Sequence, residues 1–155
     1  MEKTPSDCCV SSEESKAIRQ QVIDQLRETG MRKTEALEEL LQVMMESHKP
    51  FLLSELSEVP GLAERDQATI YRLVTKLKEL GFVRQLNFGE KGNYFQLNIA
   101  GHHHDYLLCQ RCGEISEVPF SCVLSEVEHK LRTEHGWQDL SHSLAFHGVC
   151  PECAK

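Results

Sequence analysis

The chain has 155 residues, which is enough for one compact domain or two small ones, each with a modest core. Its 40% hydrophobic and 26% charged residues are ordinary for a globular protein, and no apolar run approaches the roughly 18 residues that span a bilayer, which excludes a membrane-spanning protein. The net charge of -7 disfavours nucleic acid as a partner unless basic residues gather on one face. Residues 1–16 lack the basic start and apolar centre of a secretory signal, so we expect a cytoplasmic protein.

Apolar residues recur at helical spacing through the first half of the chain, after an N-terminal segment, residues 1–11, that we expect to be flexible. Thr34 is a good N-cap for one helix and Pro50 ends that helix. Gly30 and Gly81 are well placed to stop two others. The expected helices cover residues 12–29, 34–49, 52–59 and 66–80.

After Gly81 the pattern changes from helical to alternating: FVRQLNF and NYFQLNI flank a glycine-containing turn at residues 89–92, which predicts a β-hairpin. Helices followed by a hairpin indicate a winged helix-turn-helix domain over residues 12–99. Residues 102–155 predict a separate, small α/β domain, so the fold class is α+β. Its expected elements are strands over residues 105–108, 114–118 and 140–146 and a helix over residues 121–135.

Seven cysteines in a protein expected in the cytoplasm favour metal or thiol chemistry over disulfides. Cys109 and Cys112 form one CxxC pair, and Cys150 and Cys153 form another. Each pair can wrap one side of a tetrahedral ion, and together they predict a zinc site with four thiolates and no open position for a substrate. Two independent redox pairs, or incidental cysteines, are the alternatives.

The run HHHD at residues 102–105 offers imidazole and carboxylate ligands, which suit iron, manganese, zinc or nickel. Alternation along a strand would put His103 and Asp105 on one face and His104 and Tyr106 on the other. We therefore expect a second and a third metal site here, with a solvated turn as the alternative. Two further donors lie on the expected neighbouring strands, Glu117 and His142.

The stretch ERDQATIYRLVTKLKELG predicts a DNA-reading helix, because its basic residues outnumber the acidic ones. Short polar, aromatic and arginine side chains in its first half suit base edges and phosphates, and the hairpin that follows favours this function over an ordinary solvated helix. The candidate DNA contacts are Arg65, Gln67, Thr69, Tyr71, Arg72 and Lys76.

Four stretches together resemble the ferric uptake regulator family of iron, zinc, manganese, nickel and peroxide sensors: ATIYRLVTKLKELGFV, HHHDYLLCQRCGEISE, HSLAFHGVC and CPEC. The resemblance covers the chain from about Ile18. It implies a metal-activated homodimeric transcription factor, usually a repressor, that binds an inverted-repeat operator in double-stranded DNA. It also implies dimerisation through residues 102–155, one structural Zn2+ per chain, a regulatory Fe2+, Zn2+ or Mn2+, and no small-molecule substrate.

The resemblance assigns the four cysteines to the structural zinc. It assigns His103, Asp105 and His142 to the second site, whose fourth ligand in the family is usually Glu. That position falls at Leu124 or Ser125 of this chain, with Glu126 one step away.

The third site joins the two domains in the family and is generally regarded as the sensor. This chain retains His104 and Glu117 there, and the site looks depleted. A phenol is a poor replacement for an imidazole ligand. The departures are Tyr106 for His, Gln96 for Glu, and Pro50 near the usual His, with His48 two residues away.

Near the second helix, Arg32 and Thr34 match a DNA-engaging pattern of the family, but Leu37 stands where its second Arg would be. This departure lowers the expected DNA affinity and leaves a structural zinc protein with weakened DNA binding as one alternative.

A thiol- or peroxide-responsive regulator of the same fold is a second alternative, because Cys8, Cys9 and Cys122 lie outside the quartet. A zinc hydrolase is disfavoured because no general base stands in a context such as HExxH. No cysteine closely precedes the HHHD run, which favours an iron-type or general regulator over a zinc sensor. The sensed metal is not readable from these ligands.

Overall fold

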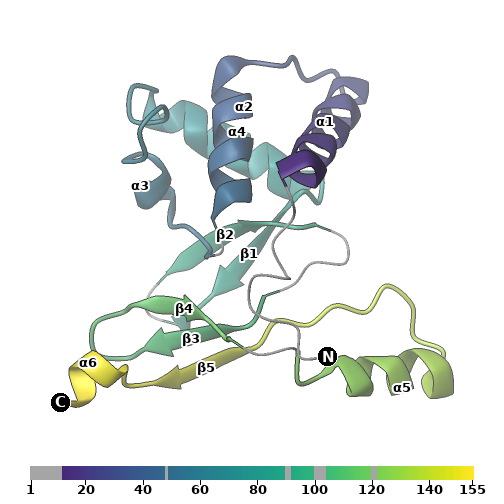
Figure 1. The fold of residues 1–155 in the computed structure, drawn as a ribbon. Coiled ribbons are helices and arrows are strands. Elements are labelled where there is room, and N and C mark those ends of the chain that lie inside the picture. Colours follow the sequence, from purple (N-terminus) through teal and green to yellow (C-terminus); the bar gives the residue numbers. More distant parts are fainter. Residues whose placement is uncertain (1–11, 48, 90–91, 100–103, 120–121) are drawn as a thin grey trace. The chain divides into compact units, whose positions relative to one another are not determined.

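In the computed structural model the described residues form two compact units, one within residues 12–99 and the other within residues 104–155. The structure describes residues 12–47, 49–89, 92–99, 104–119 and 122–155 (Figure 1). Within these ranges, no helix combines the length and apolar character that crossing a membrane requires.

The first unit contains the expected helices and hairpin. Its elements are α1 (Ser12–Glu28), α2 (Glu35–Glu46), α3 (Leu53–Leu56), α4 (Gln67–Glu79), β1 (Val83–Asn87) and β2 (Asn93–Leu97). Thr34 caps α2 as predicted, since its hydroxyl accepts a hydrogen bond from the Leu37 N–H at 3.2 Å. The prediction for α3 was too long: the chain leaves the helix after one turn and bends at Gly61, whose φ of 91° suits glycine.

One apolar core holds this unit together. Leu40 and Leu41 of α2 are fully buried in it, as are Leu56 and Leu77. Ile70, Val74 and Leu77 are the buried residues of α4, so this face of the helix packs inward and the opposite face is available at the surface. The hairpin strands pair antiparallel with Val83 opposite Leu97.

The second unit is a three-stranded sheet with helices outside it. Its elements are β3 (Tyr106–Cys109), β4 (Ile115–Glu117), α5 (Ser125–His135), β5 (Ala145–Gly148) and the short α6 (Pro151–Ala154). The strand order is β4-β3-β5, with β3 antiparallel to β4 and parallel to β5. The sheet thereby brings two distant parts of the chain to β3.

Two predicted boundaries in this unit were wrong. The last strand begins at Ala145 instead of Leu140, because the chain before it contacts α5: the Leu140 carbonyl accepts a hydrogen bond from Arg132 at 3.1 Å. The helix begins at Ser125, so Cys122 lies in the segment that leads into it. His142 therefore lies before a strand and not within one.

Candidate metal centres and DNA-reading helix

The four CxxC cysteines come together at one end of the paired strands β3 and β5. Cys109 ends β3 and Cys112 follows in the turn, while Cys150 follows β5 and Cys153 lies in α6. Their Sγ atoms all lie within 4.8 Å of one another, and we call this group the thiolate quartet. The parallel pairing of β3 with β5 explains the meeting, because it aligns Cys109 with Gly148, two residues before Cys150.

The spacing and hydrogen bonding of the quartet fit a tetrahedral zinc ion. With Zn–S bonds of about 2.3 Å, sulfurs in a tetrahedral shell lie about 3.8 Å apart, and Cys112 Sγ and Cys150 Sγ lie 3.8 Å apart. The backbone N–H of Cys150 donates to Cys109 Sγ at 3.3 Å. This hydrogen bond is the main cause that lowers the pKa of Cys109 to about 5, which favours the thiolate that metals bind.

The pKa of a neighbouring thiol is shifted in the opposite direction. The side-chain hydrogen bond with Cys150 raises the pKa of Cys153 to about 12, so without a cation the quartet combines a thiolate with a thiol that holds its proton. A divalent cation at the centre would favour the thiolate form of all the ligands.

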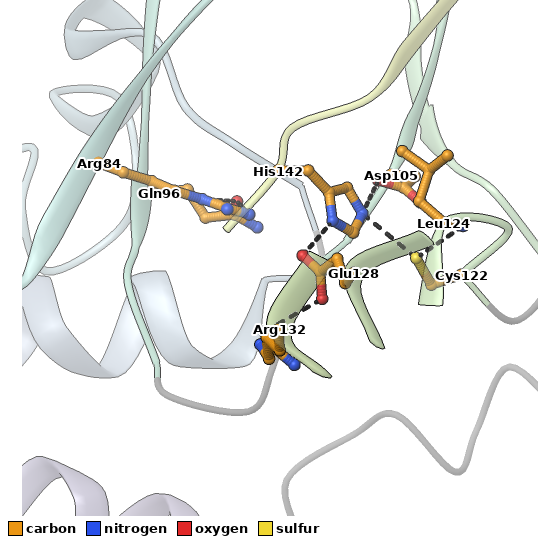
Figure 2. A network of polar contacts seen from close by, with 8 residues as sticks. All are labelled: Arg84, Gln96, Asp105, Cys122, Leu124, Glu128, Arg132 and His142. Atoms are coloured by element: carbon orange, nitrogen blue, oxygen red, sulfur yellow. Dashed lines mark hydrogen bonds and ion pairs between the residues drawn. The ribbon is translucent and has the colours of Figure 1, made fainter. Parts of the chain in front are cut away.

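A second group of possible ligands lies at the other end of the same strands. Asp105 directly precedes β3, and its carboxylate lies close to Cys122 and His142 (Figure 2). His142 Nε2 lies 3.2 Å from Cys122 Sγ and 3.5 Å from Asp105 Oδ1. We call these three residues the mixed cluster. His103, expected in the same site, lies outside the described residues.

Glu128 of α5 orients the imidazole of the mixed cluster. Its Oε1 lies 2.7 Å from His142 Nδ1, and its Oε2 accepts from Arg132 Nη2 at 3.3 Å (Figure 2). Since a carboxylate only accepts, Nδ1 carries a hydrogen that Glu128 accepts. In the neutral imidazole, the lone pair of Nε2 then faces Cys122 and Asp105.

Sequence reasoning did not assign Cys122 or Glu128 to this site. The resemblance placed the family's fourth ligand position at Leu124 or Ser125, with Glu126 one step away, but Leu124 is the N-cap of α5, and Ser125 and Glu126 are exposed. The β3–β4 hairpin, whose two strands the sequence predicted, could have identified Cys122, because a hairpin brings the chain after its second strand back to the start of its first. Because the Val118 N–H donates to the Asp105 carbonyl at 2.8 Å, the chain just beyond β4 returns to the start of β3.

The residues expected at the third site divide between the two units. Within the second unit, His104 Nδ1 lies 2.5 Å from Glu117 Oε1, and Tyr106 is fully buried in the sheet. Within the first unit, the buried Gln96 accepts from the Arg84 guanidinium through Oε1, at 2.7 Å from Nη2. A metal ion at Gln96 Oε1 would compete with a cation already there, which is consistent with a depleted site.

Helix α4 presents part of the expected DNA-contacting set. Gln67, Tyr71 and Arg72 are exposed, and Thr69 and Lys76 are half-buried. Arg65 lies before the helix and not on it.

The Arg65 guanidinium makes ion pairs with α2, to Glu35 at 2.7 Å and to Glu39 at 3.2 Å. The hydrogen bond with Glu35 is the main cause that raises the pKa of Arg65. This residue therefore links α2 to the start of α4.

Comparison with known proteins identifies the family. The model of the ferric uptake regulator family matches residues 28–147. The peroxide-responsive repressor PerR of Staphylococcus aureus is 28% identical over 133 residues, which cover 84% of this chain and 88% of that protein.

Solved structures agree in fold. The Helicobacter pylori ferric uptake regulator Fur superposes with a TM-score of 0.69 at 19% identity, covering 91% of this chain and 94% of that one. The Vibrio cholerae Fur superposes with a TM-score of 0.63 at 27% identity, covering 82% of this chain and 98% of that one. The chain belongs to the ferric uptake regulator family, a family of metal-responsive transcription regulators, as its motifs indicated.

Proposed function

We propose that this protein is a homodimeric repressor that binds an inverted-repeat DNA operator when its regulatory metal is bound. The observation that carries the proposal is that one family match, residues 28–147, extends from the winged-helix unit through the mixed cluster and the first two cysteines of the thiolate quartet. Two relatives support it: the 28% identical Staphylococcus aureus protein is a repressor, and the 27% identical Vibrio cholerae regulator has DNA-binding domains.

The thiolate quartet would hold one structural Zn2+ per chain. A closed shell of four thiolates leaves no position for a substrate, so the ion would serve to fasten the chain after β5 to the end of β3. This role fits a regulator better than an enzyme.

Helix α4 would enter the major groove. Its exposed Gln67 and Tyr71 suit base edges, and Arg72 suits a phosphate or a guanine. A twofold dimer presents the same helix to both half-sites, about 34 Å apart when they lie one helical turn from each other.

Metal and DNA binding would be reciprocally coupled. A coupling of about 1 to 3 kcal/mol makes DNA binding about 5- to 150-fold tighter in the metal-loaded protein. The mixed cluster, with or without the His104–Glu117 pair, would supply the regulatory site, because the quartet is closed.

The test is DNA affinity measured by fluorescence anisotropy on operator fragments selected from random sequence. DNA affinity is compared between protein in which only the quartet holds zinc and the same protein after addition of Zn2+, Fe2+ or Mn2+. We expect tighter binding with one of these metals and weaker binding for Arg72→Ala. Arg27→Ala, which removes an equally charged side chain exposed on α1, should bind like the wild type. Equal affinity with and without every metal would contradict the proposal.

A peroxide-responsive repressor is the second candidate, favoured by the Staphylococcus aureus relative and by the 3.2 Å contact between Cys122 and His142. Mild peroxide should then release DNA from the metal-loaded protein. If Cys122→Ser abolishes that release, the thiol is the switch, whereas release unaffected by the substitution excludes Cys122 from this role.

A further inference from the structure

We propose that Cys122 is a metal ligand, and that the mixed cluster is a zinc site with thiolate, imidazole and carboxylate donors. This set differs from the nitrogen and oxygen ligands that the family resemblance implied for Asp105 and His142. The metal binding itself stands on the geometry below. Only its role as the regulatory site rests on the proposed function.

The distances in the mixed cluster lie within about 0.3 Å of those expected around a shared tetrahedral ion. Around tetrahedral zinc, with bonds of about 2.0 Å to nitrogen and oxygen and 2.3 Å to sulfur, ligand atoms lie about 3.3 to 3.6 Å apart. The observed separations from His142 Nε2 are 3.2 Å to Cys122 Sγ and 3.5 Å to Asp105 Oδ1. All three ligand atoms lie within 4.8 Å of one another.

The Asp105 carboxylate supplies independent evidence for a cation. Asp105 is only 8% exposed, and among the residues that the structure describes its Oδ1 has no hydrogen-bond partner. Burying a carboxylate oxygen without a hydrogen bond is costly, and a divalent cation held between Oδ1 and the neighbouring donors, which include His142 Nε2 at 3.5 Å, would remove that cost.

The imidazole is prepared for the same cation. Glu128 accepts the Nδ1 hydrogen of His142, so in the neutral imidazole the lone pair of Nε2 points at Asp105 Oδ1 and Cys122 Sγ. A cation bound between Nε2 and Asp105 Oδ1, which lie 3.5 Å apart, would interact favourably with both.

The backbone holds the Cys122 sulfur in place. The Leu124 N–H donates a hydrogen bond to Cys122 Sγ at 3.3 Å, and the same sulfur lies 3.2 Å from His142 Nε2. A thiolate favours zinc over manganese or magnesium, which prefer oxygen ligands. Cys122, which follows β4, therefore gives this chain a ligand of the type that zinc prefers. No cysteine closely precedes the HHHD run.

The experiment is a Co2+ titration of the full chain with Cys8 and Cys9 replaced by Ser, after one equivalent of Zn2+ has filled the quartet. We expect one equivalent of Co2+, the second equivalent of metal, to bind with visible bands of tetrahedral cobalt and a thiolate-to-cobalt charge-transfer band in the near ultraviolet. Cys122→Ser in the same background should lose the charge-transfer band and bind Co2+ at least about 10-fold more weakly. Ser125→Ala, which alters an exposed neighbour, should match the parent.

A second measurement needs no variant of Cys122. The rate at which iodoacetamide alkylates Cys122, followed by peptide mass spectrometry, should fall when Zn2+ fills the mixed cluster. X-ray absorption of the protein with two zinc ions should show one more sulfur ligand per chain than the Cys122→Ser protein does.

Three outcomes overturn the proposal: no second equivalent binds, cobalt binds without a thiolate band, or alkylation of Cys122 is unchanged by zinc. The DNA experiment is read separately. If the thiolate band forms but DNA affinity does not respond to metal, the site stands and the proposed regulation fails. If DNA affinity responds to metal without a thiolate band, the regulation stands and this inference fails.

Discussion

Glu128 Oε1 lies 2.7 Å from His142 Nδ1, and this hydrogen bond determines which imidazole nitrogen faces Cys122 and Asp105. Removing the carboxylate frees the ring to rotate and to exchange its hydrogen between the two nitrogens. Partners of this kind typically contribute 10- to 100-fold to metal affinity, so we expect Glu128→Ala to weaken metal binding at the mixed cluster by about that factor.

Competition with a chromophoric chelator measures this change. Glu126→Ala is the matched control, because Glu126 lies in the same first turn of α5 but is exposed. Equal weakening by both substitutions would mean that the helix charge, and not the contact with His142, sets the affinity.

The second unit should depend on metal for its fold. Among its described residues, the buried apolar side chains are those of Tyr106, Leu108 and Cys109, which is a small core. A structural zinc site contributes about 10 to 16 kcal/mol of apparent binding free energy, comparable to the whole stability of a typical domain. We expect Cys153→Ser to lose the tightly held zinc and to unfold this unit.

Hydrogen exchange gives the readout. The amide of Gln110, which donates to the Gly148 carbonyl at 2.7 Å, should lose its protection in Cys153→Ser and keep it in Cys122→Ser. Protection that survives in Cys153→Ser after complete removal of zinc would contradict this expectation.

Leu37 has a structural role where the family pattern has an arginine. It is 1% exposed and packs in the core of the first unit. Leu37→Ala should lower the free energy of unfolding by about 2 to 5 kcal/mol, whereas Gln42→Ala on the exposed side of α2 should change it by less than about 0.5 kcal/mol. Urea unfolding followed by circular dichroism measures both. Nearly equal values would place Leu37 outside the core.

Arg65 and Arg72 should affect DNA binding differently. Arg72 is exposed on α4, whereas the Arg65 guanidinium is paired with Glu35 and Glu39. If Arg72 contacts a phosphate, Arg72→Ala should lower the slope of log affinity against log salt by about 1. Arg65→Ala should leave that slope nearly unchanged, because its charge is already neutralised by α2.

A salt titration of operator binding separates the two substitutions. A full unit of slope lost in Arg65→Ala would mean that Arg65 leaves its carboxylates to contact DNA.

The features that could be predicted from the sequence are those that depend on a local pattern of residues. Thr34 was identified as an N-cap because its hydroxyl acts within one turn, and the hairpin followed from alternation around glycines. The thiolate quartet was predictable because CxxC spacing itself positions two sulfurs on one ion.

What the sequence did not predict depends on contacts between distant segments. The start of β5 was misplaced because Leu140 is held by Arg132 of α5, a contact that no alternation reveals. Cys122 was left outside the metal sites because its position depends on how the chain returns after β4, and Glu128 because a helix had to bring it to His142.

Strands β3 and β5 connect the two candidate metal centres. Asp105 directly precedes β3 and Cys109 ends it, while His142 and Cys150 lie before and after β5. The two centres are therefore about 13 Å apart along the strands, at about 3.3 Å per residue. The pairing that aligns Cys109 with Gly148 also determines how close His142 comes to Asp105.

A slip of one residue between these strands would turn every side chain of β5 to the other face of the sheet. An ion in the quartet would oppose that slip, and would thereby help to bring His142 to Asp105 in the mixed cluster. Metal loading would then have a fixed order, with the quartet filled first, and zinc starvation would empty the two centres in the reverse order.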